Sequence, residues 1–166
     1  MPTNFPSGVK SRGVPVEGLG GIGSPLLTTG NVYHVDSGAD AANDGNAATN
    51  PKQPAATIDG AIGKCTANNG DVILVAPGHS ETISAAAAIT FDVAGVTVIG
   101  MGVGGSRPTI TLDTATTTDI DVTAADVQIH NIIFSMNYAD IVEVFDLSAA
   151  GFVLNKCRFV DTATNM

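Results

Sequence analysis

The stretch IDVTAADVQIHNIIFSM, residues Ile120–Met136, decides the fold, because the chain repeats its pattern 25 residues later as FDLSAAGFVLNKCRFVD, residues Phe145–Asp161. The two copies align without a gap. Apolar residues fall on matching positions, with Val127 over Phe152, Ile129 over Leu154, Ile132 over Cys157 and Phe134 over Phe159. Alternation of apolar and polar residues is the pattern of a strand that buries one face. Each copy therefore predicts two short strands separated by a corner of small residues.

An earlier segment, FDVAGVTVIG at Phe91–Gly100, fits the same pattern if two residues are deleted, which places Asp92 over Asp121 and Val96 over Val127. Three copies at roughly 25–30 residues indicate a solenoid. The copies hold no helix-length segment, as ankyrin or TPR repeats need, and no leucine-rich-repeat asparagine pattern. The architecture that remains is all-β, a short right-handed parallel β-helix whose successive turns, or rungs, lie about 4.8 Å apart.

The sequence before the repeats predicts how this stack of rungs begins. Asn31–Val35 alternates and predicts a strand, and the polar residues 36–54 predict a loop rich in turn formers. Ala55–Ala67 carries apolar residues with the spacing of a short amphipathic helix, which we expect to cap the N-terminal end of the β-helix. Asp71–Pro77 is an almost continuous apolar run, typical of a strand covered on both faces.

Residues 1–30 predict an extended arm, and residues 31–166 predict the β-helix domain. The arm contains seven glycines and four of the 8 prolines, a density that breaks regular elements. Apolar residues nevertheless recur along it, which is untypical of a disordered tail. We expect the arm to become ordered against its own domain or against a partner. Its candidate contact residues are Phe5, Val9, Arg12, Val14, Val16 and Leu19.

Composition and charge exclude several classes of function. The formal net charge is −9, and the seven Lys and Arg residues are scattered along the chain, so neither nucleic acid nor an anionic membrane is an expected partner. Cys65 and Cys157 fit neither a disulfide scaffold nor a zinc site, and we expect two free, buried thiols. The N-terminal residues lack the apolar core of a signal peptide, so synthesis in a cytoplasm without export is the expectation.

Residues Tyr33–Ile83 resemble a common opening segment of right-handed parallel β-helix proteins of the pectate-lyase-like type. The resemblance is carried by Asn43-Asp44-Gly45, Pro54, Thr57-Ile58, Ala61, Gly70-Asp71, Val75, Pro77-Gly78 and Glu81. It implies the fold, and it does not imply an activity, because such proteins include lyases, hydrolases, phage spikes and non-enzymatic shells.

The whole chain also resembles small tailed-phage proteins that begin MPTNFP-x-GV-x-S-x-GVPV. This second resemblance is carried by the arm and by the block TIDGAIGKCTANNGDVILVAPGH, residues 57–79. It implies a β-helical protein that decorates or cements a phage capsid.

A few residues merit testing as catalytic groups or metal ligands. Asp92, Asp121 and Asp146 are stacked by the repeat, and paired carboxylates can serve as general acid and base. An aspartate at a corner is more simply a turn residue, and with no Trp and 2 Tyr a sugar-stacking surface is hard to build. We therefore expect turn residues and no catalytic residue.

Other polar segments give no better candidates. The loop Asp36–Asn46 could hold a structural cation, but its spacing departs from that of an EF-hand and favours Asx turns. His79 and Ser80 point to opposite faces of an extended chain and are poorly placed to pair beside Glu81. The glycine-rich Gly100–Gly105 leads into a strand, so it predicts a loop between rungs. No cofactor and no metal are expected.

The end of the stack suggests a function. Few residues follow the rung Phe145–Asp161, and an uncovered rung exposes its apolar layer. We expect Phe152, Leu154 and Phe159 at this open end to contact other subunits, with a homotrimer as the expected oligomer. The first hypothesis is a structural virion protein, bound through its arm to the major capsid protein on the outside of the capsid. The alternative is a glycan-binding or glycan-cleaving fragment of a β-helical tail spike, and a third reading is a cell-surface binding module.

Overall fold

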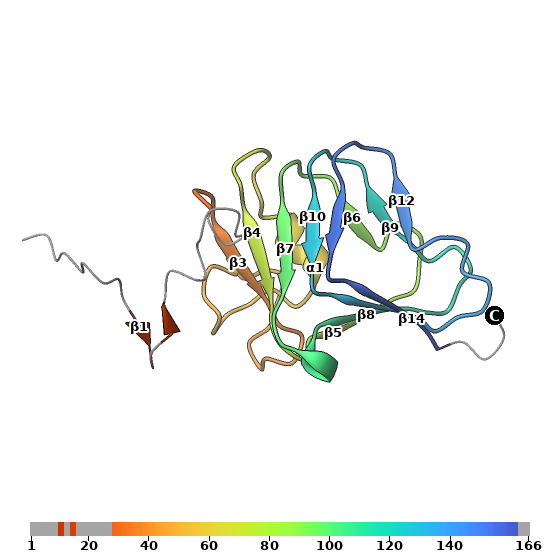
Figure 1. Ribbon diagram of the computed structural model, residues 1–166, viewed down its shortest axis with the longest axis horizontal. Helices are drawn as coiled ribbons and strands as arrows, with labels where there is room; N and C mark the ends of the chain where they lie inside the picture. The colour runs from red at the N-terminus through yellow and green to blue at the C-terminus, as the bar shows by residue number, and fades with distance from the viewer. Residues whose placement is uncertain (1–9, 12–13, 16–27, 163–166) are drawn as a thin grey trace, which may run out of the picture.

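The structure, a computed structural model, describes residues 10–11, 14–15 and 28–162. Residues 28–162 are built mainly from three parallel sheets (Figure 1). Sheet I contains β3 (Val32–Val35), β4 (Val72–Val75), β7 (Thr97–Gly100), β10 (Gln128–His130) and β13 (Val153–Asn155). Sheet II contains β5 (Ser80–Ile83), β8 (Thr109–Leu112), β11 (Ile133–Met136) and β14 (Arg158–Asp161). Sheet III contains β6 (Ile89–Phe91), β9 (Ile120–Val122) and β12 (Phe145–Leu147).

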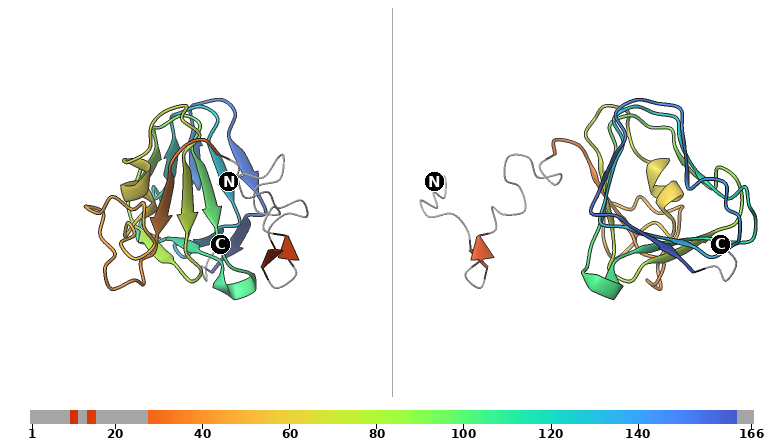
Figure 2. Two further views of the ribbon diagram at one scale, coloured as in Figure 1. Left: turned by 90° about the vertical axis from the view of Figure 1, so that its left-hand side faces the viewer. Right: turned by 45° about the vertical axis from the view of Figure 1, so that its right-hand side comes forward.

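The chain winds through the three sheets in a fixed order. From β4 onward it visits sheets I, II and III in turn, and each return to sheet I adds a strand beside the previous one. The rungs are β4–β5–β6, β7–β8–β9 and β10–β11–β12, followed by β13–β14, and β3 precedes them in sheet I. Seen partly along the stack, the rungs outline a triangle (Figure 2). The fold is therefore an all-β parallel solenoid.

The strand register confirms the repeat of 25 residues over the last two copies. Ile120 pairs with Phe145, and Phe134 pairs with Phe159. Inward-facing positions of successive rungs thus form columns of like residues. Most of their side chains are Val, Ile, Leu and Phe. They fill the interior of the triangle, because burial there removes their apolar surface from water.

The predicted alignment of the earlier copy is wrong at Asp92. Thr90 pairs with Asp121, and Phe91 pairs with Val122, while Thr97 pairs with Gln128. The connection from sheet III to sheet I therefore has the same length in both copies, and the predicted two-residue deletion does not exist. The added length of this rung lies instead between β7 and β8, where the connection contains the 3-10 turn η2 (Gly104–Ser106). Corner length varies freely because a corner buries little, whereas a shift within a strand would turn its apolar side chains outward.

The predicted helix is present but shorter than expected. It spans α1 (Ile58–Ile62) rather than Ala55–Ala67, and it contacts β3, β4 and β6. Ala55 is extended and bridges to Val35, so the helix starts only after Thr57, whose hydroxyl accepts a hydrogen bond from the Gly60 amide. Within the described residues, no helix has the length and apolar character needed to cross a membrane.

Part of the arm is described. β1 (Lys10–Ser11) and β2 (Val14–Pro15) form an antiparallel pair, so the candidate contact residue Val14 lies in a strand. The other candidate arm residues lie outside the described residues: Phe5, Val9, Arg12, Val16 and Leu19.

Candidate functional site

The last rung exposes apolar side chains that earlier rungs bury at the same positions. Phe91 and Val122 are buried, and Leu147, the next residue in their column, is 51% exposed. In another column Phe134 is fully buried, and Phe159 is 46% exposed. Each side chain loses its cover only where no described strand follows it. The exposure is a property of the end of the stack, which we call the open end, rather than of individual residues.

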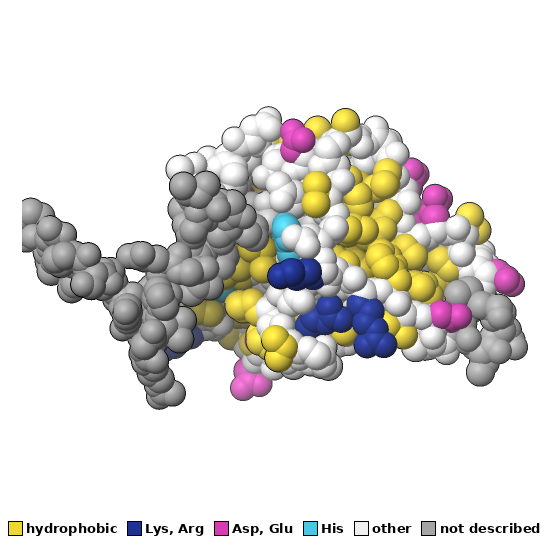
Figure 3. All heavy atoms as spheres, viewed as in Figure 1, with side chains coloured by type: hydrophobic (Ala, Val, Ile, Leu, Met, Phe, Trp, Pro, Cys, Tyr) yellow, Lys and Arg dark blue, Asp and Glu magenta, His cyan; other side chains and the backbone are white. Residues whose placement is uncertain are grey.

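Aromatic rings gather at the open end. Phe159 stacks on Phe134 with ring centroids 5.3 Å apart, and Phe145 meets Phe134 edge to face at 5.0 Å. Phe152 lies 5.2 Å from Phe145 and, like Leu154, is half-buried against the core. Figure 3 shows the hydrophobic side chains that gather on this side of the molecule, beside a group of Lys and Arg side chains. The three residues predicted for the open end therefore lie in the last rung, and each keeps some exposed surface.

Carboxylates of sheet III line its outer face near the open end. Asp121 and Asp146 pair across β9 and β12, as predicted, and Asp119 precedes them. Burial, followed by the charges of Asp119 and Asp146, raises the pKa of the Asp121 carboxyl above its ordinary value. These carboxylates are close enough to influence each other, and only two of the three predicted members of the ladder belong to it.

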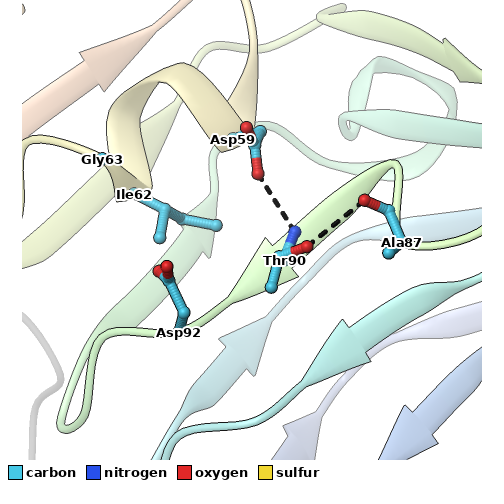
Figure 4. A pocket seen from close by; sticks show the side chains of 6 residues that line it. All are labelled: Asp59, Ile62, Gly63, Ala87, Thr90 and Asp92. Atoms are coloured by element: carbon cyan, nitrogen blue, oxygen red, sulfur yellow. Dashed lines mark hydrogen bonds between the residues drawn. The ribbon is translucent and has the colours of Figure 1, made fainter.

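Asp92, the third predicted member, lies at the other end of the stack. With Asp59 of α1 and Thr90 of β6 it lines a hollow of about 300 Å3 between the helix and sheet III (Figure 4). Asp59 accepts a hydrogen bond from the Thr90 amide at 3.0 Å, so its carboxylate binds the free edge of β6. That contact is structural, because it supplies an edge amide with the partner that a further strand would otherwise provide.

His79 is buried and joins three segments. Its Nδ1 accepts a hydrogen bond from the Ser37 amide at 3.0 Å, which leaves the proton on Nε2, 3.3 Å from Oε2 of Glu81. The same Glu81 oxygen accepts a hydrogen bond from the Ile58 amide at the start of α1. Both ring nitrogens thus have partners other than Ser80. His79 and Glu81 thus hold the loop at Ser37, the start of α1 and β5 together. The arrangement presents no nucleophile to the imidazole.

Two side chains of the polar loop 36–46 bond backbone amides two residues along, as the Asx-turn interpretation predicted. Asp36 accepts from the Gly38 amide, and Asn43 accepts from the Gly45 amide, two residues along in each case. Asp44 accepts from the Ala56 and Thr57 amides just before α1. Over the described residues, no cluster of three or more His, Cys, Asp or Glu side chains could hold a metal ion.

A basic corner is the feature that sequence reasoning missed. Arg107 donates a hydrogen bond through Nη1 to the Lys156 carbonyl at 3.0 Å, across 49 residues of chain. With Arg158, these residues place positive charge at the corner between sheets I and II, beside a hollow of about 490 Å3 lined in part by His130 and Asn155. Burial and the Lys156 charge lower the His130 pKa. These basic residues are far apart in the sequence, and only the winding of the chain brings them to one corner.

The two cysteines are free, as predicted, but they are half-buried rather than buried. Burial, together with the charge of Asp71, raises the pKa of the Cys65 thiol to about 12. Burial also raises the pKa of Cys157. Both thiols therefore stay protonated near neutral pH, and neither has the thiolate character of a reactive cysteine.

Comparison with known proteins gives no assignment: no protein-family model, no curated protein and no solved structure matches this chain.

Proposed function

We propose that the protein is a non-enzymatic structural protein of a tailed-phage virion, which decorates the outer capsid surface and binds the major capsid protein through residues 1–30. The observation that carries the proposal is the group of apolar side chains exposed on the last described strands, where Leu147 and Phe159 are 51% and 46% exposed although Val122 and Phe134, beside them in the preceding rung, are buried. An exposed apolar patch is a common mark of an interaction surface. The resemblance of the arm to tailed-phage proteins suggests which assembly the chain belongs to.

The proposal includes a finer description of the fold. The stack is a right-handed parallel β-helix, since parallel crossover connections are right-handed in about 98% of cases. The helix α1 caps its N-terminal end, which its contacts with β3, β4 and β6 support. Residues 1–30 act as an extended arm. The weak arm contacts of many copies on one capsid together give firm attachment.

Deletion of residues 1–30 tests the capsid role. The truncated chain should keep the circular dichroism spectrum of the full chain and should no longer sediment with capsids that lack the native protein. The full chain, added to the same capsids, is the matched control. Mass spectrometry of purified virions should find hundreds of copies per particle. Capsid binding by the truncated chain would contradict the proposed role of the arm, and a handful of copies would favour a tail spike.

A glycan-binding or glycan-cleaving spike fragment is the second candidate. Its supporting observation is the group Asp119, Asp121 and Asp146, in which Asp121 and Asp146 pair across β9 and β12 and the pKa of Asp121 is raised above its ordinary value. If this group cleaves glycans, Asp121→Asn should abolish release of reducing ends from host polysaccharide, and Asp92→Asn should leave it intact. Equal release by wild type and Asp121→Asn would remove this group from any catalytic role.

A further inference from the structure

We propose that Asn69 is a site of spontaneous covalent modification, at which the Gly70 backbone nitrogen displaces the side-chain amide, and that this conversion loosens the N-terminal end of the stack. The inference goes beyond the proposed function and does not depend on it. It rests on three features of the loop between α1 and β4: an exposed reactive pair, the direction of the Asn69 side chain and the close crossing of residues 28–31.

The reactive pair is Asn69-Gly70, the one Asn-Gly step in the sequence. Both residues are exposed. The Gly70 amide donates no hydrogen bond within the part of the chain that the structure describes, and glycine has no Cβ to shield its nitrogen. Its φ of 76° lies in the left-handed region, so the turn itself favours glycine at this position. The fold thus needs a glycine where that glycine also leaves a nucleophile uncovered.

The Asn69 side chain is directed towards this nucleophile. Its Nδ2 donates a hydrogen bond to Oδ1 of Asp71 at 2.7 Å, which turns the side chain forward along the chain, past Gly70, rather than back towards α1. The Asn69 backbone amide donates to the Thr66 carbonyl at 3.2 Å and fixes the turn from the other side. A nucleophile held beside its target in one chain reacts in a unimolecular step, without the entropy cost of bringing two molecules together.

The reaction needs only water and a base from solvent. The deprotonated Gly70 nitrogen attacks Cγ of Asn69, a bond forms between them, and the bond from Cγ to Nδ2 breaks. The leaving nitrogen takes up protons from water and departs as ammonia, which leaves a five-membered succinimide ring. Water then opens the ring at one of its two carbonyl groups. One product is aspartate, and the other is isoaspartate, in which the main chain runs through the former side chain.

Either product disturbs the hydrogen bonds of Asp71. The new carboxylate cannot donate to Asp71, and it places a second negative charge where the amide lay 2.7 Å from Oδ1. Like charges this close repel each other. Asp71 also accepts hydrogen bonds from the Asn31 and Thr66 amides, so the repulsion acts on the residue that joins β3 to β4.

Isoaspartate adds a second disturbance, because it lengthens the main chain by one carbon where two backbones cross. A Cβ placed on Gly30 would lie 2.6 Å from the Gly70 carbonyl carbon and 2.7 Å from the Asn69 carbonyl oxygen. The Thr28 hydroxyl donates a hydrogen bond to the Gly70 carbonyl. Close-packed backbones leave no room for an added atom. The conversion should therefore displace residues 28–31, which lead into β3.

Mass spectrometry of the full chain, incubated folded at mildly alkaline pH, tests the modification. Trypsin releases residues 65–107 as one peptide, in which the asparagines are Asn68 and Asn69, and fragmentation tells the two apart. Asn69 should be converted, faster as the pH rises, because the attacking amide must lose its proton. An isoaspartyl methyltransferase should label the product. Asn69→Gln, which would have to close a six-membered ring, should remain unlabelled.

Asn137 is the internal control. It is exposed, and its Nδ2 donates to the Asp113 carboxylate at 3.2 Å, as Asn69 donates to Asp71. The residue that follows it is Tyr138, whose side chain shields the backbone nitrogen. Asn137 should stay intact over the time in which Asn69 is converted. Equal rates at the two asparagines would overturn the proposal.

A second incubation in urea shows whether the fold permits the attack. Any Asn-Gly pair can react in an unfolded chain, so conversion of Asn69 is expected there. The proposal requires conversion in the folded chain as well. Conversion in urea with an intact Asn69 in the native protein would show that the fold blocks the reaction, and would overturn the proposal.

The structural consequence is measured on the converted protein. Its added negative charge allows ion exchange to separate it from the unconverted protein. It should unfold at a lower urea concentration, and the amides of β3 should exchange hydrogen faster. Asn69→Asp, which has the charge but no added backbone atom, should lie between the two. Equal unfolding midpoints for converted and unconverted protein would contradict the proposed loosening.

Discussion

At Thr114 the backbone takes a φ of 78°, in the left-handed region that favours glycine. For an L residue this conformation costs about 1–2 kcal/mol, and a β-branched side chain is especially disfavoured there. Thr114→Gly should raise the free energy of unfolding by about 0.5–1 kcal/mol, because the strain removed exceeds the added entropy of the unfolded chain. Urea denaturation measures the difference. Thr116→Gly in the same exposed loop, where φ is not positive, is the control and should be neutral or destabilising.

The raised pKa of Asp121 makes a second prediction at this scale. A carboxyl whose pKa is higher in the folded state than in the unfolded state contributes stability below the unfolded value, ordinarily 3.8, and loses it as pH rises through the folded value. Asp121→Asn should therefore be more stable than wild type at pH 7, and the difference should shrink as pH falls toward 4. Thermal unfolding across this range checks the trend. A difference that does not change with pH would contradict it, and Asp92→Asn serves as the control.

Among the connections between elements, the one between α1 and β4 depends on a single buried carboxylate. Asp71 accepts hydrogen bonds from the Asn31 and Thr66 amides and from Asn69 Nδ2, each at 2.7 Å. It thereby joins the start of β3, the loop after α1 and the start of β4. Hydrogen bonds to a charged acceptor are stronger than neutral ones, and donors left buried without partners are costly.

Asp71→Ala should therefore lower the free energy of unfolding by about 3 kcal/mol, measured by urea denaturation. Asp92→Ala, at an exposed position, should change it by less than about 0.5 kcal/mol. Asp71→Asn should fall between the two, because the amide retains one accepting oxygen. A cost below about 1 kcal/mol for Asp71→Ala would show that water replaces the carboxylate as acceptor.

For the whole molecule, the stack predicts a gradient of stability along each column. Phe134 and Phe159 occupy the same column, one fully buried and the other 46% exposed. Phe134→Ala should cost about 3–5 kcal/mol, as for a buried aromatic residue, and Phe159→Ala about half as much. Urea denaturation at a protein concentration low enough to prevent any association between chains measures both costs. Equal costs would mean that the last rung is already covered within the monomer.

The sequence by itself determined the class of fold and the composition of its core. The repeat from Ile120–Met136 to Phe145–Asp161 predicted the strand pairing residue by residue, and the structure has that register. The prediction works because alternation of apolar and polar residues is a local property that any pair of neighbouring rungs must share. The same columns indicated which side chains would lie in the last rung.

Only the tertiary structure decided the corners and the outer faces. It moved Asp92 out of the carboxylate ladder and brought Arg107 to the Lys156 carbonyl. The physical reason is that corner lengths and outward-facing side chains are weakly constrained by burial. Their positions follow from how many residues each turn of the chain takes, and this becomes known only when the rungs are stacked.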